Sequence, residues 1–156
     1  MLIRVAAVGQ RMPDWVSMAW QEYARRFPRN IRLEIHEIPM ERRGKNADIA
    51  RLKDQEGWAL LDSVPRDAHI IAMDERGKQW RTMDLATRLE DWMSGGRDVC
   101  LLVGGPDGLS NECRAQAPQT WSLGPLTLPH PLVRVVLAEQ LYRAWSIVNH
   151  HPYHRE

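Results

Sequence analysis

The chain has 156 residues, a normal size for one domain that can bury its own core without disulfides. Its 21 Lys and Arg residues nearly balance 20 Asp and Glu residues, which excludes a uniformly basic nucleic-acid binder. No apolar stretch reaches the length of a membrane span, and the first residues read as a strand rather than as a signal peptide, so the sequence predicts a cytoplasmic protein.

Strand and helix signals alternate along the whole chain. Short apolar or alternating runs predict strands at residues 2–8, 31–38, 68–73, 98–103 and 121–123. Apolar residues at helical spacing predict helices that begin after Pro13, after Asn46 or Asp48, at Thr82 or Asp84, after Ser110 and at Pro131. The apolar positions of the first two helices include Trp15, Ile49 and Trp58. This order predicts a single α/β domain over residues 1–156, with a mostly parallel sheet and helices on both faces.

Three loops are candidates for ligand binding, because ligands of open parallel sheets lie beyond the carboxyl ends of the strands. They follow Met73, Val103 and Leu123. The loop Gly104–Gly108 is the best of them, since its three glycines let a ligand approach the backbone closely. It matches neither a Walker loop nor a dinucleotide fingerprint, and the absence of a following Lys disfavours a phosphate cradle in a nucleotide-binding domain. The segment Asp74–Gly77 is predicted to be a turn.

The last segment, Trp121–Glu156, joins the most apolar helix of the chain to a tail rich in His, Tyr and Arg. His130 stands at the start of this helix, next to a candidate ligand loop. His150 and His151 are adjacent, and no Cys or carboxylate completes a set of metal ligands around them, so no metal site is predicted. The two cysteines of the chain make neither a disulfide framework nor a zinc site.

An arginine breaks the apolar stripe of this last helix. At helical spacing, Arg134 falls in line with Ala138, Leu141 and Trp145. A buried charge needs a partner, because an unpaired one is very costly. Two readings stay open at this stage: a structural ion pair, with Glu139 of a second subunit as the candidate partner, or an anion clamp near the helix start.

Basic residues are concentrated between Arg25 and Lys45, where seven Lys or Arg residues accompany three acidic ones. Such a run is commonly a solvated charged face. The alternative is a local patch that contacts the phosphates of a nucleic acid.

Three motifs, taken together, closely resemble the RlmH family of SPOUT-class methyltransferases. They are GRDVCLLVGGPDGLS at 96–110, LTLPHPLVRVVLAEQLYRAW at 126–145 and the terminal HHPYHRE. The segments VGQRMPDWV and RRGKNADI agree as well, so the resemblance covers essentially the whole chain. It implies a C-terminal trefoil knot, a rare exception to unthreaded connections. It also implies a homodimer with the active site at the interface, which uses S-adenosylmethionine to methylate N3 of a pseudouridine in 23S ribosomal RNA of the assembled ribosome.

The same resemblance assigns roles to individual residues. The expected cofactor pocket consists of Met73, Gly104, Gly105, Gly124, Pro125, Leu126, Thr127, Leu128 and Pro129. The expected catalytic and RNA-binding residues are His130, Arg134, Tyr153, His154 and Arg155. Either His154 or His130 would be the general base, Arg155 or Arg134 would stabilise charge on the base carbonyls, and Tyr153 would position the base.

The sequence departs from the family pattern at three points. Met73 stands where Leu is usual, Asp107 replaces a Glu, and Gly124-Pro125 lies where a serine is common. Two alternatives within the resemblance are an RNA methyltransferase for a different nucleotide and a non-catalytic ribosome-binding factor.

Overall fold

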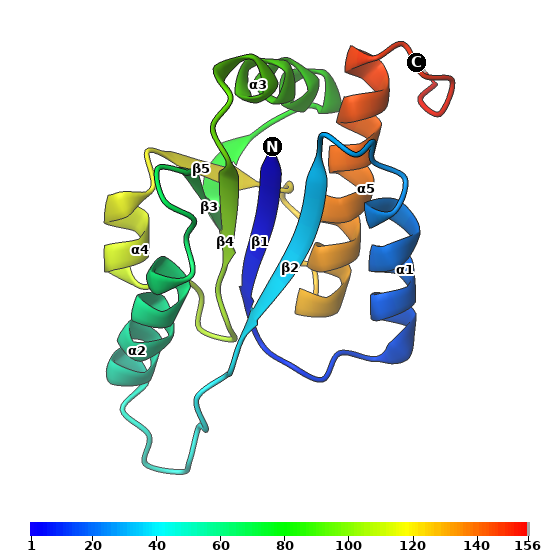
Figure 1. Cartoon of the computed structure of the whole chain (residues 1–156). Helices are drawn as coiled ribbons and strands as arrows, with labels where there is room; N and C mark the ends of the chain where they lie inside the picture. Colours follow the sequence, from blue (N-terminus) through cyan, green and yellow to red (C-terminus); the bar gives the residue numbers. More distant parts are fainter. Residues whose placement is uncertain (156) are drawn as a thin grey trace.

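The computed structural model describes residues 1–155 and contains strands and helices in strict alternation (Figure 1). In chain order they are β1 (Leu2–Val8), α1 (Asp14–Ala24), β2 (Arg32–Ile38), α2 (Ile49–Asp62), β3 (His69–Gln79), α3 (Thr82–Gly95), β4 (Val99–Val103), α4 (Asn111–Gln116), β5 (Gln119–Ser122) and α5 (His130–Val148). Asp48 and Ser110 cap α2 and α4 through their side chains, and Pro131 stands in the first turn of α5.

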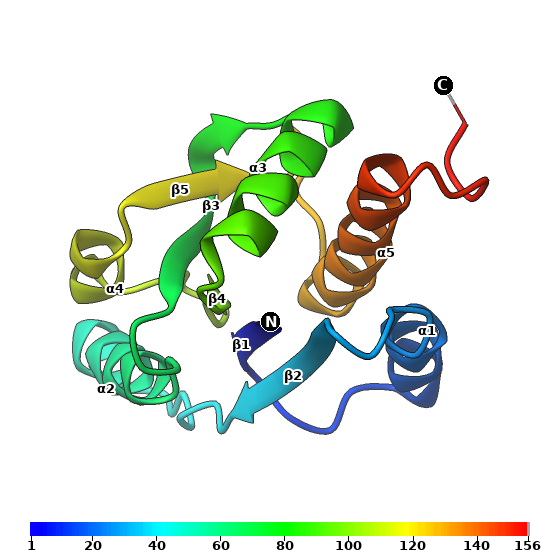
Figure 2. The ribbon, with the colours of Figure 1, turned by 45° about the horizontal axis from the view of Figure 1, so that its top comes forward.

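The strands form one five-stranded sheet in the order β2-β1-β4-β3-β5, and every described pairing is parallel. Helices α1, α3 and α5 cover one face, while α2 and α4 cover the other; Figure 2 shows α5 between α1 and α3. The predicted α/β fold, with helices on both faces of a parallel sheet, is therefore confirmed. Connections of this kind bring the carboxyl ends of all strands to one edge of the sheet.

Each face of the sheet has its own apolar core. On the α1/α3/α5 face, Trp20, Leu89 and Leu141 are at most 4% exposed. On the other face, Leu60 and Cys113 pack against the central strands. All residues of β4 are buried, which explains its continuous apolar sequence. Each fully buried Leu or Ile stabilises the fold by about 1.5–3 kcal/mol, because its side chain is removed from water. Together the two cores fix the strands, and with them the edge of the sheet.

One predicted turn is wrong. The segment Asp74–Gly77 belongs to β3, because the pairing of β3 with β5 shifts register between Met73 and Lys78 and then resumes. At Gly77, a Cβ would lie 2.8 Å from the carbonyl carbon of Thr120. The turn-forming residues thus do not reverse the chain. They form an irregularity within β3 that packs closely against β5.

Three predicted apolar positions of helices are largely in water. Trp15 on α1 is 50% exposed, and on α2 Ile49 and Trp58 are 40% and 59% exposed. Helical spacing shows which residues share the apolar face of a helix. How much of that face the sheet and the neighbouring helices cover decides which of these residues are buried. Within residues 1–155, no helix has the length and apolar character needed to cross a bilayer.

Candidate functional site

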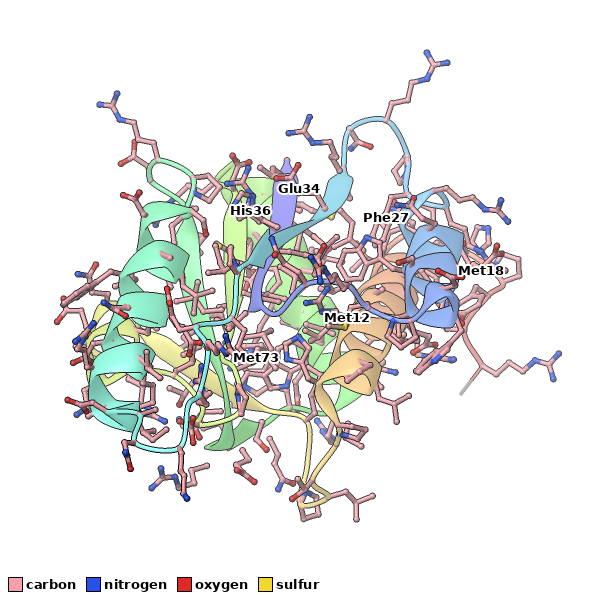
Figure 3. The ribbon with its side chains drawn as sticks, turned by 90° about the horizontal axis from the view of Figure 1, so that it is seen from below. Met12, Met18, Phe27, Glu34, His36 and Met73 are labelled. Atoms are coloured by element: carbon pink, nitrogen blue, oxygen red, sulfur yellow. The ribbon has the colours of Figure 1, made fainter. Side chains whose placement is uncertain are left out.

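A cavity of about 970 Å³ opens at the carboxyl edge of the sheet. It lies where β1 and β4 end and where β3 changes register after Met73, beside the loop that joins β5 to α5. Seven of the nine predicted cofactor residues line it: Met73, Gly104, Gly105, Gly124, Leu126, Thr127 and Leu128. Pro125 and Pro129 belong to the same loop but are not among the lining residues in the described part of the chain. Figure 3 views the molecule from below and shows Met73 and Met12, both lining residues, in the central part of the molecule.

The glycine loop after β4 is a tight turn that requires its glycines. The N–H of Gly108 donates to the carbonyl of Gly105 at 3.0 Å, and a Cβ on Gly104 would lie 2.5 Å from the carbonyl carbon of Gly108. Gly108 itself has φ +81°, a conformation that favours glycine. Peptide groups rather than side chains therefore form this wall of the cavity, as the sequence predicted.

The loop after β5 forms the opposite wall. Gly124 has φ +129°, and its N–H donates to the hydroxyl of Ser122 at 3.1 Å. Ser122 stands two residues before Gly124-Pro125, which is the stretch where a serine is common in the family pattern. Leu126 of this loop is 77% exposed and lies at the edge of the cavity.

An ion pair that the sequence did not reveal also lines the cavity. Nε of Arg114, on α4, donates to Oδ2 of Asp74 at 2.7 Å. Burial alone would raise the pKa of Asp74, but hydrogen bonds from Arg114 and from the N–H of Arg76 outweigh it and lower that pKa. Asp74 could have been found from its place directly after Met73, whereas nothing in the spacing of α4 singled out Arg114.

Arg134 is buried behind the cavity, with 3% of the residue exposed, and all three guanidinium nitrogens have partners in the same chain. Nη1 pairs with Glu37 at 2.8 Å, Nη2 donates to the carbonyl of Gly9 at 2.7 Å, and Nε donates to Nε2 of His130 at 3.0 Å. Within the chain, the acidic partner of Arg134 is therefore Glu37 at the end of β2, whereas the sequence offered Glu139 of a second subunit as the candidate.

His130 lines the cavity, and its Nε2 accepts from Nε of Arg134 at 3.0 Å. In the neutral ring the proton is therefore on Nδ1. Burial, reinforced by the positive charge of Arg134, lowers the pKa of His130, and the backbone of Gly104 partly offsets this effect. His130 thus connects the wall of the cavity to the buried Arg134.

The predicted catalytic tail lies at the other end of α5. The hydroxyl of Tyr153 donates to Glu139 at 3.0 Å, and Nδ1 of His154 lies 3.0 Å from the hydroxyl of Ser146. Burial and hydrogen bonds with Tyr23 and Glu139 raise the pKa of Tyr153. At 1.5 Å per residue, the 16 residues from His130 to Ser146 span about 24 Å. In Figure 1 the red tail leaves the upper end of α5, while the loops around the cavity lie below.

The structure therefore divides the predicted site residues into two groups. His130 and the cofactor loops lie together at the cavity, with Arg134 directly behind them. Tyr153, His154 and Arg155 do not reach that cavity within their own chain. Glu139, which was expected to pair with Arg134, instead accepts from Arg143 and from Tyr153.

The basic run between Arg25 and Lys45 is continuous in sequence but not in space. β2 separates its two ends by about 20 Å, since seven strand residues each advance about 3.3 Å. Among the described residues, Arg29 at one end and Arg42 and Lys45 at the other make no ion pair. The remaining four are paired: Arg25 and Arg26 with Glu22, Arg32 with Glu34, and Arg43 with Glu56 and Asp107. The run therefore forms two basic groups, one at each end of β2, and not one continuous cluster.

Over residues 1–155, no group of three or more His, Cys, Asp or Glu side chains is arranged to hold a metal ion. Cys100 and Cys113 are both buried as free thiols, and burial raises the pKa of Cys100 to about 12. Such a thiol is a packing residue and not a nucleophile at neutral pH.

Known proteins resemble the chain over its full length. The family described as predicted SPOUT methyltransferase matches residues 1–154. The ribosomal RNA large subunit methyltransferase H of Thioalkalivibrio sulfidiphilus (strain HL-EbGR7) is 56% identical over 156 residues, which covers 100% of both chains. The two matches span the sheet, both loops of the cavity and nearly all of the C-terminal tail. The chain therefore belongs to the SPOUT methyltransferase family.

Proposed function

We propose that this protein transfers a methyl group from S-adenosylmethionine to ribosomal RNA of the large subunit, at N3 of a pseudouridine in 23S RNA on the assembled ribosome. The observation that carries the proposal is the 56% identity, without a length difference, to a protein named ribosomal RNA large subunit methyltransferase H. Family membership supports the methyltransferase chemistry and implies the trefoil knot of the SPOUT fold. An enzyme with this substrate works where ribosomes are, in the cytoplasm.

The residues around the cavity fit S-adenosylmethionine. Its apolar lining, including Met73, Val103 and Leu128, suits the adenine ring, and the glycine loops offer peptide groups at close range. A Cβ on Gly104 would clash with the backbone of Gly108, and one on Gly105 would crowd Val8, so this wall of the cavity keeps its shape only with glycines. When bound, the cofactor supplies a methyl group on a sulfonium; the chain's own task is to hold that group in line with the attacking nitrogen. Positioning of this kind is worth about 7–11 kcal/mol in favourable cases.

The hydrogen bonds of the two candidate histidines favour His154 as the general base. Ser146 donates its only hydroxyl proton to the carbonyl of Arg143, so Nδ1 of His154 must donate to Ser146. Nε2 of neutral His154 is then free to accept the N3 proton of the target base. His130 offers no such free nitrogen, because its Nε2 accepts from Arg134 and its Nδ1 carries the ring proton.

The same reasoning favours Arg155 over Arg134 for stabilising charge on the base. Every nitrogen of Arg134 is committed to Glu37, Gly9 or His130, and the residue is 3% exposed. Arg155 is exposed next to the proposed base. A cationic group that remains free can approach the carbonyl oxygens where negative charge develops.

A distance of about 24 Å along α5 between cavity and tail supports an active site built from two copies of the chain. In the proposed homodimer, the tail of one subunit reaches the cavity of the other. Apolar residues at the start of α5 and in the loop before it are exposed and offer a contact surface: Leu126 and Leu132 are 77% and 39% exposed. Exposed apolar residues beside a site commonly mark an interface.

The near-neutral charge of the protein is consistent with a large structured substrate. Recognition would rest on the shape of the ribosome and on a few phosphate contacts. Arg42 and Lys45 are the candidates for these contacts, because they are exposed in the loop that follows β2, and Met40 of that loop lines the cavity. Free RNA would then be a poor substrate.

Two measurements test the proposal. Titration calorimetry with S-adenosylmethionine separates a methyltransferase from a ribosome-binding factor without cofactor and from a nucleotide-binding domain. Mass spectrometry of 23S RNA from ribosomes incubated with protein and cofactor then locates the methyl group. A new methyl on a pseudouridine of 23S RNA is expected; a methyl on another nucleotide, or none despite cofactor binding, would refute the assigned reaction.

A further inference from the structure

The ion pair between Asp74 and Arg114 is the one pair, within residues 1–155, whose two members both line the cavity. Their side chains are 11% and 28% exposed, so the pair is mostly withdrawn from water. Ion pairs in such surroundings cost desolvation energy, which makes them weak contributors to stability. Their position at a ligand cavity therefore suggests a role in binding.

Arg114 has donors to spare. Of its five N–H groups, the one on Nε is used by Asp74, and neither Nη1 nor Nη2 has a hydrogen-bond partner in the described chain. These four N–H groups form the fork that binds a carboxylate through two parallel hydrogen bonds. A Cβ on Gly108 would lie 3.8 Å from Nη2, so the glycine loop also keeps the space beside the guanidinium open.

Asp74 fixes the direction of this fork. Its Oδ2 accepts from Arg114, and its Oδ1 accepts from the N–H of Arg76 at 2.9 Å. The carboxylate is therefore held at two points, by the N–H of Arg76 within β3 and by Arg114 of α4. Each oxygen still has a second lone pair, which can accept from an ammonium group.

We infer that the Asp74–Arg114 pair recognises the amino-acid end of the cofactor, with Arg114 binding its carboxylate and Asp74 orienting Arg114 and accepting from the ammonium. The inference rests on the proposed function, since it takes S-adenosylmethionine as the ligand. A zwitterion and an ion pair are complementary when each charge faces its opposite. The pair thus distinguishes the complete cofactor from adenosine derivatives that lack an amino acid.

The test compares two ligands, one with this part and one without it. S-adenosylmethionine carries the amino-acid end, whereas 5′-methylthioadenosine retains the adenosine and the sulfur without it. 5′-Methylthioadenosine also lacks the sulfonium charge, but this difference is the same for every variant, so it cancels when the ratio of the two affinities is compared between a variant and the full chain. Dissociation constants are measured by titration calorimetry for the full chain and for Arg114→Gln, Asp74→Asn and Arg66→Gln. Arg66→Gln is the matched control, because it removes the same charge from an arginine that is paired with an aspartate, Asp67, but is 95% exposed and does not line the cavity.

Arg114→Gln should weaken S-adenosylmethionine binding by about 10- to 100-fold, the value of a lost charged hydrogen bond, and leave 5′-methylthioadenosine binding nearly unchanged. Asp74→Asn should shift the same ratio in the same direction by a smaller factor, and Arg66→Gln should not shift it. If Arg114→Gln does not fold, Arg114→Lys serves instead, because it keeps the charge, loses the fork and should give a smaller selective loss.

Each other outcome overturns the inference. Equal weakening of both ligands would mean that the pair only supports the fold of the cavity. Unchanged affinity for both would mean that Arg114 faces something other than the cofactor, such as an RNA phosphate. A wild-type protein that binds 5′-methylthioadenosine but not S-adenosylmethionine, or that binds neither, would refute the cofactor assignment itself. This result differs from a failure of the inference alone, in which the wild-type protein binds S-adenosylmethionine but Arg114→Gln causes no selective loss.

Discussion

Arg134→Met separates the two readings that the sequence left open for this residue, a structural ion pair or an anion clamp. Methionine keeps much of the apolar stem and removes the guanidinium. The variant therefore deletes the bond to Glu37 and leaves the carbonyl of Gly9 and Nε2 of His130 without their donor. If Arg134 is structural, the loss falls on the stability of the free protein, before any ligand is added.

The expected loss follows from burial on the two sides of the pair. The side chain of Arg134 is 4% exposed, but that of Glu37 is 36% exposed and can regain water. Breaking a buried pair costs about 3–5 kcal/mol, and the exposure of Glu37 places this case at the lower end. For a chain of this size, about 3 kcal/mol corresponds to a fall in melting temperature of about 6–12 °C.

Urea unfolding followed by circular dichroism gives the free energy directly, with thermal melting as the second measurement. Arg81→Met is the matched control, because the Arg81 side chain is 83% exposed and its pair with Asp84 should be worth at most about 1 kcal/mol. A loss for Arg134→Met no larger than that of the control would refute the structural reading. An unchanged stability together with weaker anion or substrate binding would establish the clamp.

Three further predictions concern the tail, the pH dependence and the helix contact of α2. His154→Ala should abolish methylation and leave S-adenosylmethionine affinity unchanged in calorimetry; residual methylation at the wild-type rate would remove His154 from the mechanism. His130 has a pKa below its usual 6.5, so the unfolded chain binds its proton more tightly, and part of the unfolding free energy should be lost as pH falls from about 7 towards 5. His130→Gln should flatten this slope, and equal slopes in both proteins would contradict the prediction. Gly57→Ala should destabilise the fold by about 1–3 kcal/mol in urea unfolding, because the new Cβ would lie 2.9 Å from Cβ of Ser110; an unchanged midpoint would show that α4 moves aside freely.

The strands and the position of the cavity could be predicted because both depend on local sequence. A buried parallel strand such as β4 is a continuous apolar run, and the loop that follows it must lie at the carboxyl edge of the sheet. Its glycines then indicate a wall made of backbone. The individual residues came from the family resemblance, and seven of the nine expected cofactor residues line the cavity.

The ion pairs could not be predicted, because their partners are distant in sequence. Arg134 and Glu37 are 97 positions apart, and Asp74 and Arg114 are 40 positions apart. Helical periodicity showed that Arg134 is buried but not what it meets. The sheet order decides that, since it brings the end of β2 and the start of α5 to the same edge.

Gly57 weakens the sequence pattern that predicts helix α2, yet it stabilises the fold. A glycine inside a helix costs roughly 1 kcal/mol relative to alanine, which reduces the sequence signal for α2. The structure explains its presence, because α4 approaches so closely there that Ser110 leaves no room for a side chain. The thiol of Cys113 lies 3.4 Å from the carbonyl of Gly57, at the same contact.

The separation of tail and cavity makes a prediction about mixtures of two inactive variants. One variant lacks residues 153–156 and keeps the cavity. The other, Thr127→Trp, keeps the tail and fills the cavity from an exposed position that should not disturb the core. If each tail acts on the cavity of its partner, a mixed dimer regains one complete site out of two.

After subunit exchange at equal concentrations, half of the dimers are mixed, so methylation should recover to about a quarter of the wild-type value. If each tail acts on its own cavity, no chain in the mixture carries both functional parts, and no activity can return. The two arrangements therefore predict different methylation by the mixture: about a quarter of the wild-type value for a shared site, and none for a site within one chain. Recovery of activity would show that the two ends of α5 serve different active sites, and continued inactivity after verified exchange would refute the proposed active site shared between subunits.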